Sequence, residues 1–272
     1  MEYTMIQPPD YLRNYVRYYW VLESNASTTL LPKTFGTIAD GSPGIIFQQS
    51  DQGKFFQEQK ELPAVFLYGQ TTKYSQIAGP GSFRTIGVYF HPHALKSVFG
   101  FNAVELTDSC VDIDLVSTRR FSRLSEMLLN AVGLDAQLEI LNAFLFAKAK
   151  QNNRPEDRIS AYAVSRIAKA KGVFDLKLLQ NDLHLTERSI ERRFKSDVGI
   201  SPKLLSRIFQ FQAAMKGLRE NNYHKLSDIA YENTYADQSH FIRAFKEFAG
   251  FTPSQYLKQS EELVENFPEM KR

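Results

Sequence analysis

The chain has 272 residues, which is enough for two domains of ordinary size. Hydrophobic residues make up 43% and charged residues 23%, a balance that excludes wholesale disorder and collagen-like or low-complexity architectures. The net charge of +3 is unevenly distributed along the chain. Residues 155–258 hold 17 Lys and Arg against 12 Asp and Glu, while residues 1–154 hold 14 of each kind. This excess alone identifies no partner.

The first residues of the chain predict no export signal. Glu2 and Asp10 stand where a secretory signal carries Lys or Arg ahead of an apolar core. The longest apolar run, residues 64–68, is far shorter than the ~18 residues of a membrane-spanning helix, so no membrane partner is expected. Cys110 is the single cysteine, which excludes an internal disulfide and fits a reducing compartment. Together these features predict a cytoplasmic protein.

Short β-type runs dominate the first ninety residues. Residues 15–22, 44–48, 64–68 and 83–90 are rich in Val, Ile, Tyr and Phe, and Gly, Pro, Asp and Ser clusters separate them. This spacing predicts an antiparallel sheet or barrel, and we assign residues 1–115 to a β-rich domain.

Helices follow this domain. The pattern predicts a short helix over 94–99 and longer ones over 117–131 and 135–150. Four leucines three or four residues apart form one stripe along the last of these helices: Leu134, Leu138, Leu141 and Leu145. Such a stripe is expected to be buried against another apolar surface. We therefore assign residues 116–151 to a helical linker that would form a homodimer. The polar run 151–157 contains Pro155 and marks a domain boundary.

Every segment beyond this boundary is helical in pattern. Seven helices are expected over 158–171, 175–182, 186–198, 202–220, 227–232, 237–249 and 253–259. The sequence thus predicts an α+β two-domain protein. Its N-terminal domain would be β-rich and barrel-like with trailing helices, its all-α domain would span residues 156–259, and residues 260–272 would form a tail.

A repeat lies within the all-α domain. Residues 185–202, LTERSIERRFKSDVGISP, align with residues 236–253, ADQSHFIRAFKEFAGFTP, at an offset of 51. Five positions are identical and in register: Arg192/Arg243, Phe194/Phe245, Lys195/Lys246, Gly199/Gly250 and Pro202/Pro253. Two unrelated amphipathic helices would rarely agree in this way, so the repeat indicates a duplicated unit.

Each copy reads as a short helix, a turn and a capped second helix. Thr186 and Asp237 are favourable N-caps, and Gly199 and Gly250 suit a positive φ at the helix end. The pattern is that of a helix-turn-helix unit. The residues expected to face outward and to contact DNA bases are Arg188, Glu191 and Arg192 in the first copy and Gln238, Ser239, Ile242 and Arg243 in the second. Lys195 and Lys246, near the helix ends, suit phosphates.

The helix between the copies supports the same interpretation. Residues 202–220 would span about 28 Å at about 1.5 Å per residue, close to the ~34 Å between successive major-groove faces of B-DNA. Two recognition helices would then fit adjacent major grooves of double-stranded DNA.

Residues 226–257, LSDIAYENTYADQSHFIRAFKEFAGFTPSQYL, resemble the signature of AraC/XylS-type transcriptional regulators. The resemblance covers roughly residues 158–258. It implies a DNA-binding domain with two helix-turn-helix units acting at promoters, where RNA polymerase would be a further partner, and it implies base-facing roles for the seven outward residues named above. It also implies an N-terminal domain that senses a small molecule or dimerises.

Two positions depart from the family pattern. Thr234 stands where the family usually has glycine in the second turn, and a β-branched residue would strain any positive φ there. Gln210 replaces a common arginine on the linking helix, which predicts one phosphate contact fewer.

The alternative hypothesis is a metal- or thiol-dependent enzyme domain fused to the helix-turn-helix units. His91 and His93 suggest metal ligands, but a third imidazole is missing nearby and Pro92 favours a bend at a strand end. Cys110 lies between acidic residues that oppose thiolate formation. We therefore expect no enzymatic activity, no metal and no cofactor. The aromatic residues of the first half either line a small-molecule cavity or form ordinary core: Tyr18, Tyr19, Trp20, Phe35, Phe47, Phe66, Tyr68 and Tyr89.

Overall fold

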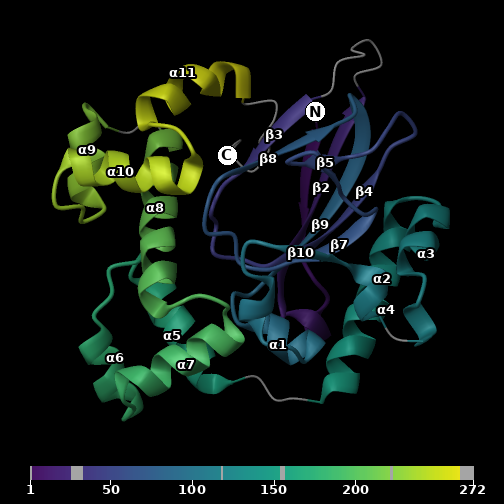
Figure 1. Cartoon of the computed structure of the whole chain (residues 1–272), viewed down its shortest axis with the longest axis horizontal. Coiled ribbons are helices and arrows are strands. Elements are labelled where there is room, and N and C mark those ends of the chain that lie inside the picture. The colour runs from purple at the N-terminus through teal and green to yellow at the C-terminus, as the bar shows by residue number, and fades with distance from the viewer. Residues whose placement is uncertain (1, 26–32, 118, 154–156, 221–222, 264–272) are drawn as a thin grey trace.

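The computed structural model describes residues 2–25, 33–117, 119–153, 157–220 and 223–263. Two β-sheets with helices against them form the N-terminal part, and a group of helices forms the C-terminal part beside it (Figure 1). The α+β fold class predicted from the sequence is confirmed.

Both sheets of the N-terminal domain are antiparallel. The six-stranded sheet has the order β1-β2-β9-β4-β7-β10, and its strands are Glu2–Ile6, Val16–Asn25, Ser82–Phe90, Gly44–Gln49, Val65–Tyr68 and Cys110–Asp112. The four-stranded sheet has the order β3-β8-β5-β6, with strands Lys33–Thr37, Ser75–Gly79, Phe56–Gln57 and Lys60–Glu61. The two sheets share no strand, so the domain is an open, barrel-like pair of sheets.

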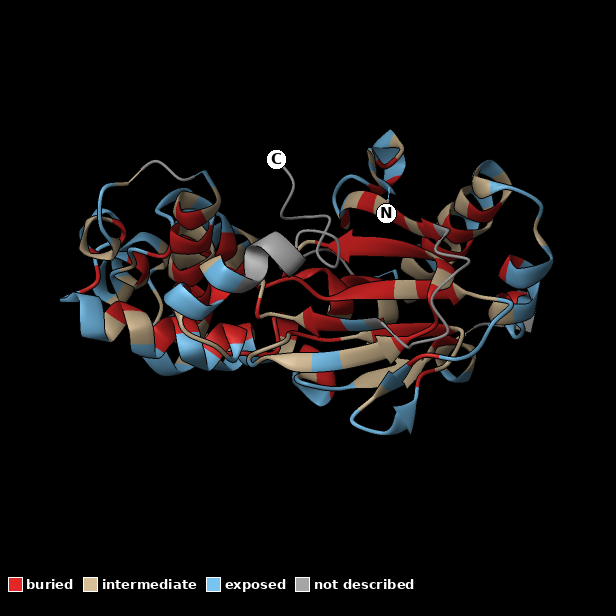
Figure 2. Ribbon diagram, turned by 90° about the horizontal axis from the view of Figure 1, so that it is seen from above, coloured by how far each residue is buried: buried red, intermediate tan, exposed pale blue. Residues whose placement is uncertain are grey.

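The four strands expected from the sequence correspond to β2, β4, β7 and β9. Most of the Val, Ile, Tyr and Phe residues in these runs are buried (red in Figure 2), while Tyr18, Ile46 and Tyr68 are half-buried. Aromatic and aliphatic side chains pack between the two sheets and form one core cluster: Leu22, Phe35, Phe55, Leu62, Phe66 and Phe83.

Helices cover the outer face of the six-stranded sheet. They are α1 (Ala94–Phe99), α2 (Ile113–Val116), α3 (Leu124–Asn130) and α4 (Leu134–Asn152). The helix expected over 117–131 is shorter than predicted: a 3-10 turn spans Arg119–Phe121 before α3, and the Phe121 ring is buried 5.5 Å from that of Phe144. Residue 118 lies outside the described residues.

The leucine stripe packs within its own domain. Leu141 and Leu145 on α4 are buried in the core under the sheet, and Leu134 and Leu138 pack against that core. The stripe that suggested a homodimer is therefore already covered by the same chain, so a dimer would need another surface.

Seven helices form the described part of the C-terminal domain, as predicted. They are α5 (Arg158–Lys169), α6 (Leu176–Leu183), α7 (Glu187–Asp197), α8 (Pro202–Glu220), α9 (Leu226–Glu232), α10 (Gln238–Ala249) and α11 (Pro253–Leu263). Residues 260–263 of the expected tail belong to α11, and residues 264–272 lie outside the described residues. Within the described residues, no helix is long and apolar enough to cross a membrane.

One short segment of the N-terminal domain enters the C-terminal core. Ala39, which follows β3, is fully buried among the apolar side chains of the C-terminal helices, and Ile38 packs against the same cluster. The two domains thus share part of one core.

Candidate nucleic-acid interface and cavity

Helices α7 and α10, the second helices of the two repeated units, begin with the side-chain caps that the sequence predicts. Thr186 Oγ1 accepts a hydrogen bond from the Ser189 amide at 3.4 Å, and Asp237 Oδ1 accepts one from the His240 amide at 2.7 Å. Each cap satisfies a first-turn N–H group that has no partner within its helix. Helix α7 therefore begins at Glu187 and α10 at Gln238.

The expected glycines follow the ends of both helices, since Gly199 lies two residues after α7 and Gly250 directly after α10. Gly199 has φ +95 and Gly250 has φ +78, which are conformations that other residues rarely adopt. The buried faces also match, since Ile190 and Phe194 on α7 and Phe241 and Phe245 on α10 point into one core. The repeat at offset 51 is thus a repeat of structure.

The predicted DNA-contacting residues lie on the opposite faces. On α7, Arg188, Arg192 and Lys195 are exposed and Glu191 is half-buried. On α10, Gln238, Ser239, Arg243 and Lys246 are exposed and Ile242 is half-buried. The fold therefore leaves these faces accessible to a partner, while the role of each residue stays a prediction.

The five cations on these faces make no ion pair with any described residue. They are Arg188, Arg192, Lys195, Arg243 and Lys246. Two other arginines of the domain are paired: Arg193 Nη1 lies 3.3 Å from Asp157 Oδ2, and Arg207 Nη2 lies 2.6 Å from Glu247 Oε2. The structure thus separates arginines that hold the domain together from cations that remain available to an anionic ligand.

The turns of the two units differ in shape. In the first unit His184 has φ +51, and in the second unit Thr234 has φ +58, so the left-handed residues are 50 positions apart and not 51. Thr234 therefore carries the strain that its β-branched side chain predicts. Gln210 lies against this turn, because its Nε2 donates to the Asn233 carbonyl at 2.8 Å. The glutamine at position 210, where the family usually has arginine, thus stabilises the turn through this hydrogen bond.

A cavity of about 1370 Å³ lies between the two sheets and reaches helix α8. Six of the aromatic residues singled out in the sequence line it: Tyr18, Trp20, Phe35, Phe66, Tyr68 and Tyr89. Tyr19 and Phe47 instead belong to the core under the helices. Gln212 and Lys216 of α8 are among the lining residues, so the C-terminal domain contributes one wall.

Asp40 is a half-buried carboxyl group on the cavity wall. Burial raises the pKa of its carboxyl, although hydrogen bonds from the Tyr89 hydroxyl and the Ser42 amide and the charge of Arg17 oppose the shift. Tyr89 stacks on Tyr18 with ring centroids 5.0 Å apart. The wall is thus a connected polar and aromatic network.

The candidate enzyme residues lie apart from one another. The His91 and His93 rings stack 5.8 Å apart at the start of α1, whereas Cys110 lies on β10 and lines the cavity. Burial raises the pKa of the Cys110 thiol. The described residues contain no group of three or more His, Cys, Asp or Glu side chains placed to hold a metal ion.

Two families match separate parts of the chain. A family described as a helix-turn-helix domain matches residues 179–259, and a family described as a domain of unknown function (DUF6597) matches residues 4–112. No curated protein matches the chain.

Solved structures of ToxT from Vibrio cholerae are similar over both domains. ToxT of strain O395 bound to (E)-4-(8-methylnaphthalen-1-yl)but-3-enoic acid has a TM-score of 0.48 and 14% identity, covering 95% of this chain and 99% of that one. A ToxT structure in a P21 form has a TM-score of 0.47 and 15% identity, covering 88% and 98%. Wild-type ToxT of strain SCE256 with bound unsaturated fatty acid has a TM-score of 0.46 and 14% identity, covering 94% of each chain. A likeness at this level assigns no role to any residue here.

Proposed function

We propose, from the premise that residues 179–259 are an AraC-type helix-turn-helix domain, that the chain is a sequence-specific DNA-binding transcriptional regulator. In this proposal α7 and α10 enter adjacent major grooves of double-stranded DNA. The observation that carries the proposal is the pair of repeat-equivalent helices whose exposed faces bear five cations without an ion-pair partner among the described residues. Arg and Gln side chains can make two hydrogen bonds to guanine and adenine edges, and Lys suits phosphates.

The length of helix α8 supports the placement of α7 and α10 in adjacent major grooves. Helix α8 has 19 residues, which gives about 28 Å of rise between the two units. Successive major-groove faces of B-DNA are ~34 Å apart. The remaining distance is within reach of side chains and of the turns at the two ends of α8.

Selection of bound duplexes from a random pool tests the proposal with the full chain. We expect enrichment of two contacted segments about ten base pairs apart between their centres. Footprinting on the selected duplex should then protect both segments. A bound pool without any enriched sequence would show only nonspecific DNA binding, and the regulator proposal would be wrong.

A small-molecule effector in the cavity is the second part of the proposal. Both aromatic and charged side chains line the cavity, nine and eleven of them respectively, which suits a molecule with an apolar part and one or more charged or polar groups. Because α8 forms part of the wall, a bound molecule would contact both domains directly. This contact would link occupancy to DNA binding.

Mass spectrometry under native conditions tests this part. We expect a small molecule to be retained by the wild-type chain and lost from an Ile46→Trp variant, because Ile46 is half-buried and lines the cavity. Ile140→Trp is the matched control, since Ile140 packs in the core under the sheet away from the cavity. Retention of the same molecule by Ile46→Trp would remove the cavity from the proposal.

A homodimer and RNA polymerase remain proposed partners. Because the leucine stripe is covered by its own domain, dimerisation would use another exposed surface. Sedimentation of the wild-type chain at micromolar concentration measures the oligomeric state, and a purely monomeric species bound to the selected duplex would exclude the dimer.

A further inference from the structure

The N-terminal domain contacts both recognition helices at the same place in the repeat. Asp197 ends α7 and Phe248 lies near the end of α10, and these residues are 51 positions apart, as are Gly199 and Gly250. Each of the four contacts a residue of the N-terminal domain. The contact regions therefore lie at the C-terminal ends of the helices, beyond the first two turns that hold the predicted base-contacting residues.

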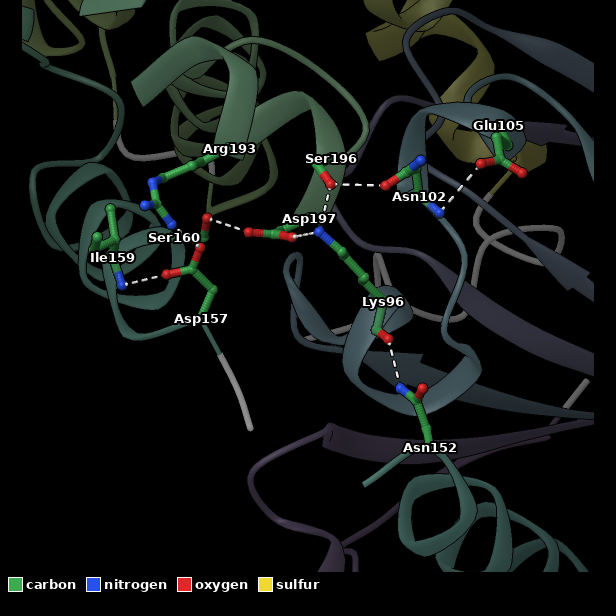
Figure 3. A network of polar contacts seen from close by, with 10 residues as sticks. All are labelled: Lys96, Asn102, Glu105, Asn152, Asp157, Ile159, Ser160, Arg193, Ser196 and Asp197. Atoms are coloured by element: carbon green, nitrogen blue, oxygen red, sulfur yellow. Dashed lines mark hydrogen bonds and ion pairs between the residues drawn. The ribbon is translucent and has the colours of Figure 1, made fainter. Parts of the chain in front are cut away.

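The contact at α7 is polar. Lys96 Nζ of α1 lies 3.0 Å from Asp197 Oδ1 and donates to Ser196 Oγ at 2.6 Å (Figure 3). Asp197 also accepts a hydrogen bond from Ser160 Oγ at 2.7 Å, and only 5% of its side chain is exposed. We call Lys96, Ser196 and Asp197 the α7 contact. A buried charge of this kind depends on its partner, because loss of one ion leaves the other unpaired.

A second hydrogen bond extends the α7 contact. Thr107 Oγ1 donates to the Gly199 carbonyl at 2.8 Å. A Cβ at Gly199 would lie 2.9 Å from this hydroxyl oxygen, so the close approach needs glycine as well as its positive φ. Lys96, Thr107 and the described residues between them do not line the cavity, although Asp108, directly after Thr107, does.

The contact at α10 is made by the main chain and by apolar groups. The Ala39 amide donates to the Phe248 carbonyl at 3.2 Å, and Gln212 Nε2 of α8 donates to the Ala39 carbonyl at 2.5 Å. The Tyr74 ring lies 5.7 Å from that of Phe251. We call Ala39, Tyr74 and Phe248 the α10 contact.

The α10 contact adjoins the cavity on both sides of each of its N-terminal segments, whereas, among the described residues, the α7 side adjoins it only through Asp108, the residue after Thr107. Ile38 and Asp40 on either side of Ala39 line the cavity, and so do Lys73 and Ser75 on either side of Tyr74. Alternate residues of an extended segment point to opposite sides, so a molecule that displaces Ile38 or Asp40 also displaces the backbone of Ala39. The segment has little freedom, because a Cβ at Gly41 would lie 2.6 Å from Phe209 Cε1 on α8.

We propose that the N-terminal domain fixes the two recognition helices by separate contacts, and that an occupant of the cavity moves α10 relative to α7 through the Ala39 and Tyr74 segments. This inference rests on the proposed function for its effect on DNA binding. It specifies which of the two helices responds and which stays in place. The spacing of the two helices is then the quantity that an effector controls.

Hydrogen–deuterium exchange of the full chain tests the proposal without DNA. Cys110 is the only cysteine and lines the cavity, so alkylation with a maleimide places an occupant at one known position. We expect about tenfold faster exchange in peptides covering residues 37–42 and 245–251 and no change over residues 194–200. The maleimide-treated Cys110→Ser variant is the control for labelling elsewhere. Equal change over both helix ends, or change over residues 194–200 alone, would overturn the proposal.

Two variants keep the test decisive if alkylation unfolds the domain. Ile46→Trp places a larger side chain within the cavity and should reproduce the pattern, with peptides from β4 and β9 reporting that the sheet is intact. Lys96→Met should give the opposite pattern, with faster exchange over residues 194–200 alone, while Lys96→Arg should keep the wild-type rates. No change over residues 37–42 and 245–251 in Ile46→Trp would contradict the proposal.

The outcomes separate this inference from the proposed function. If the exchange pattern is as expected and duplex selection enriches no sequence, the coupling of the cavity to α10 is supported and the regulator proposal is wrong. If a sequence is enriched and the exchange pattern is absent, the regulator proposal is supported and the coupling of the cavity to α10 is wrong.

Discussion

Gln210 on α8 donates a hydrogen bond from Nε2 to the main-chain carbonyl of Asn233, at 2.8 Å, in the turn of the second helix-turn-helix unit. The next residue, Thr234, has φ +58. A left-handed backbone conformation costs a residue with a side chain roughly 1–2 kcal/mol. Glycine adopts the same conformation at little cost, because it has no Cβ. The side chain from the linking helix thus holds a strained turn in place.

Thr234→Gly should stabilise the protein. Relief of the strain outweighs the extra freedom of glycine in the unfolded chain, so we expect the free energy of unfolding to rise by up to about 1 kcal/mol. Chemical denaturation measures the change. Thr186→Gly is the control, since this N-cap residue has a negative φ and loses its cap. A lower stability of Thr234→Gly would show that the turn is unstrained.

Arg192→Ala and Arg243→Ala should each weaken binding to the selected duplex by about 1–3 kcal/mol and relax specificity at one position, as expected for base contacts. Lys195→Ala and Lys246→Ala should weaken binding to all sequences and lower the salt slope by about 1 each. Titrations at several salt concentrations distinguish the two effects. Arg123→Ala, an equal charge change on an exposed residue of the N-terminal domain, is the control. Equal losses in all five variants would indicate nonspecific electrostatics.

Leu145→Ala should destabilise the N-terminal domain by about 2–5 kcal/mol, because it opens a space in a packed core. Leu115→Ala is the matched control, since Leu115 is 79% exposed and its truncation should stay within about 0.5 kcal/mol. Thermal and chemical unfolding measure both. A Leu145→Ala variant of wild-type stability that alters only sedimentation would restore the leucine stripe as an interface.

Asp40→Asn should change the pH dependence of stability. Because burial raises the pKa of Asp40 in the folded state, its contribution is fully present below the pKa of the unfolded chain and is lost as the pH rises through the folded value. The asparagine variant lacks this loss, so its stability relative to wild type should increase from about pH 4 towards neutral pH. Denaturation at a series of pH values measures it. A relative stability that falls over this range would mean that Arg17 and the hydrogen bonds dominate.

The two helix-turn-helix units could be predicted from the sequence alone. Their signals are local: a cap residue, apolar side chains four apart, a glycine at the helix end and a proline after it. Thr186 and Asp237 begin the helices and Gly199 and Gly250 follow them, as expected. Those local rules also placed the exposed cations, because a helix with one apolar stripe must turn its other face to solvent.

The tertiary structure decided which surfaces meet. Lys96 and Asp197 are 101 residues apart, and Ala39 and Phe248 are further apart still, so no periodicity or spacing connects them. The same holds for the leucine stripe, whose periodicity showed that it is buried but could not identify the sheet of its own domain as the partner. Helix caps are set by a few neighbouring residues, whereas domain contacts and the cavity depend on how every strand and helix packs, and that information is spread over the whole chain.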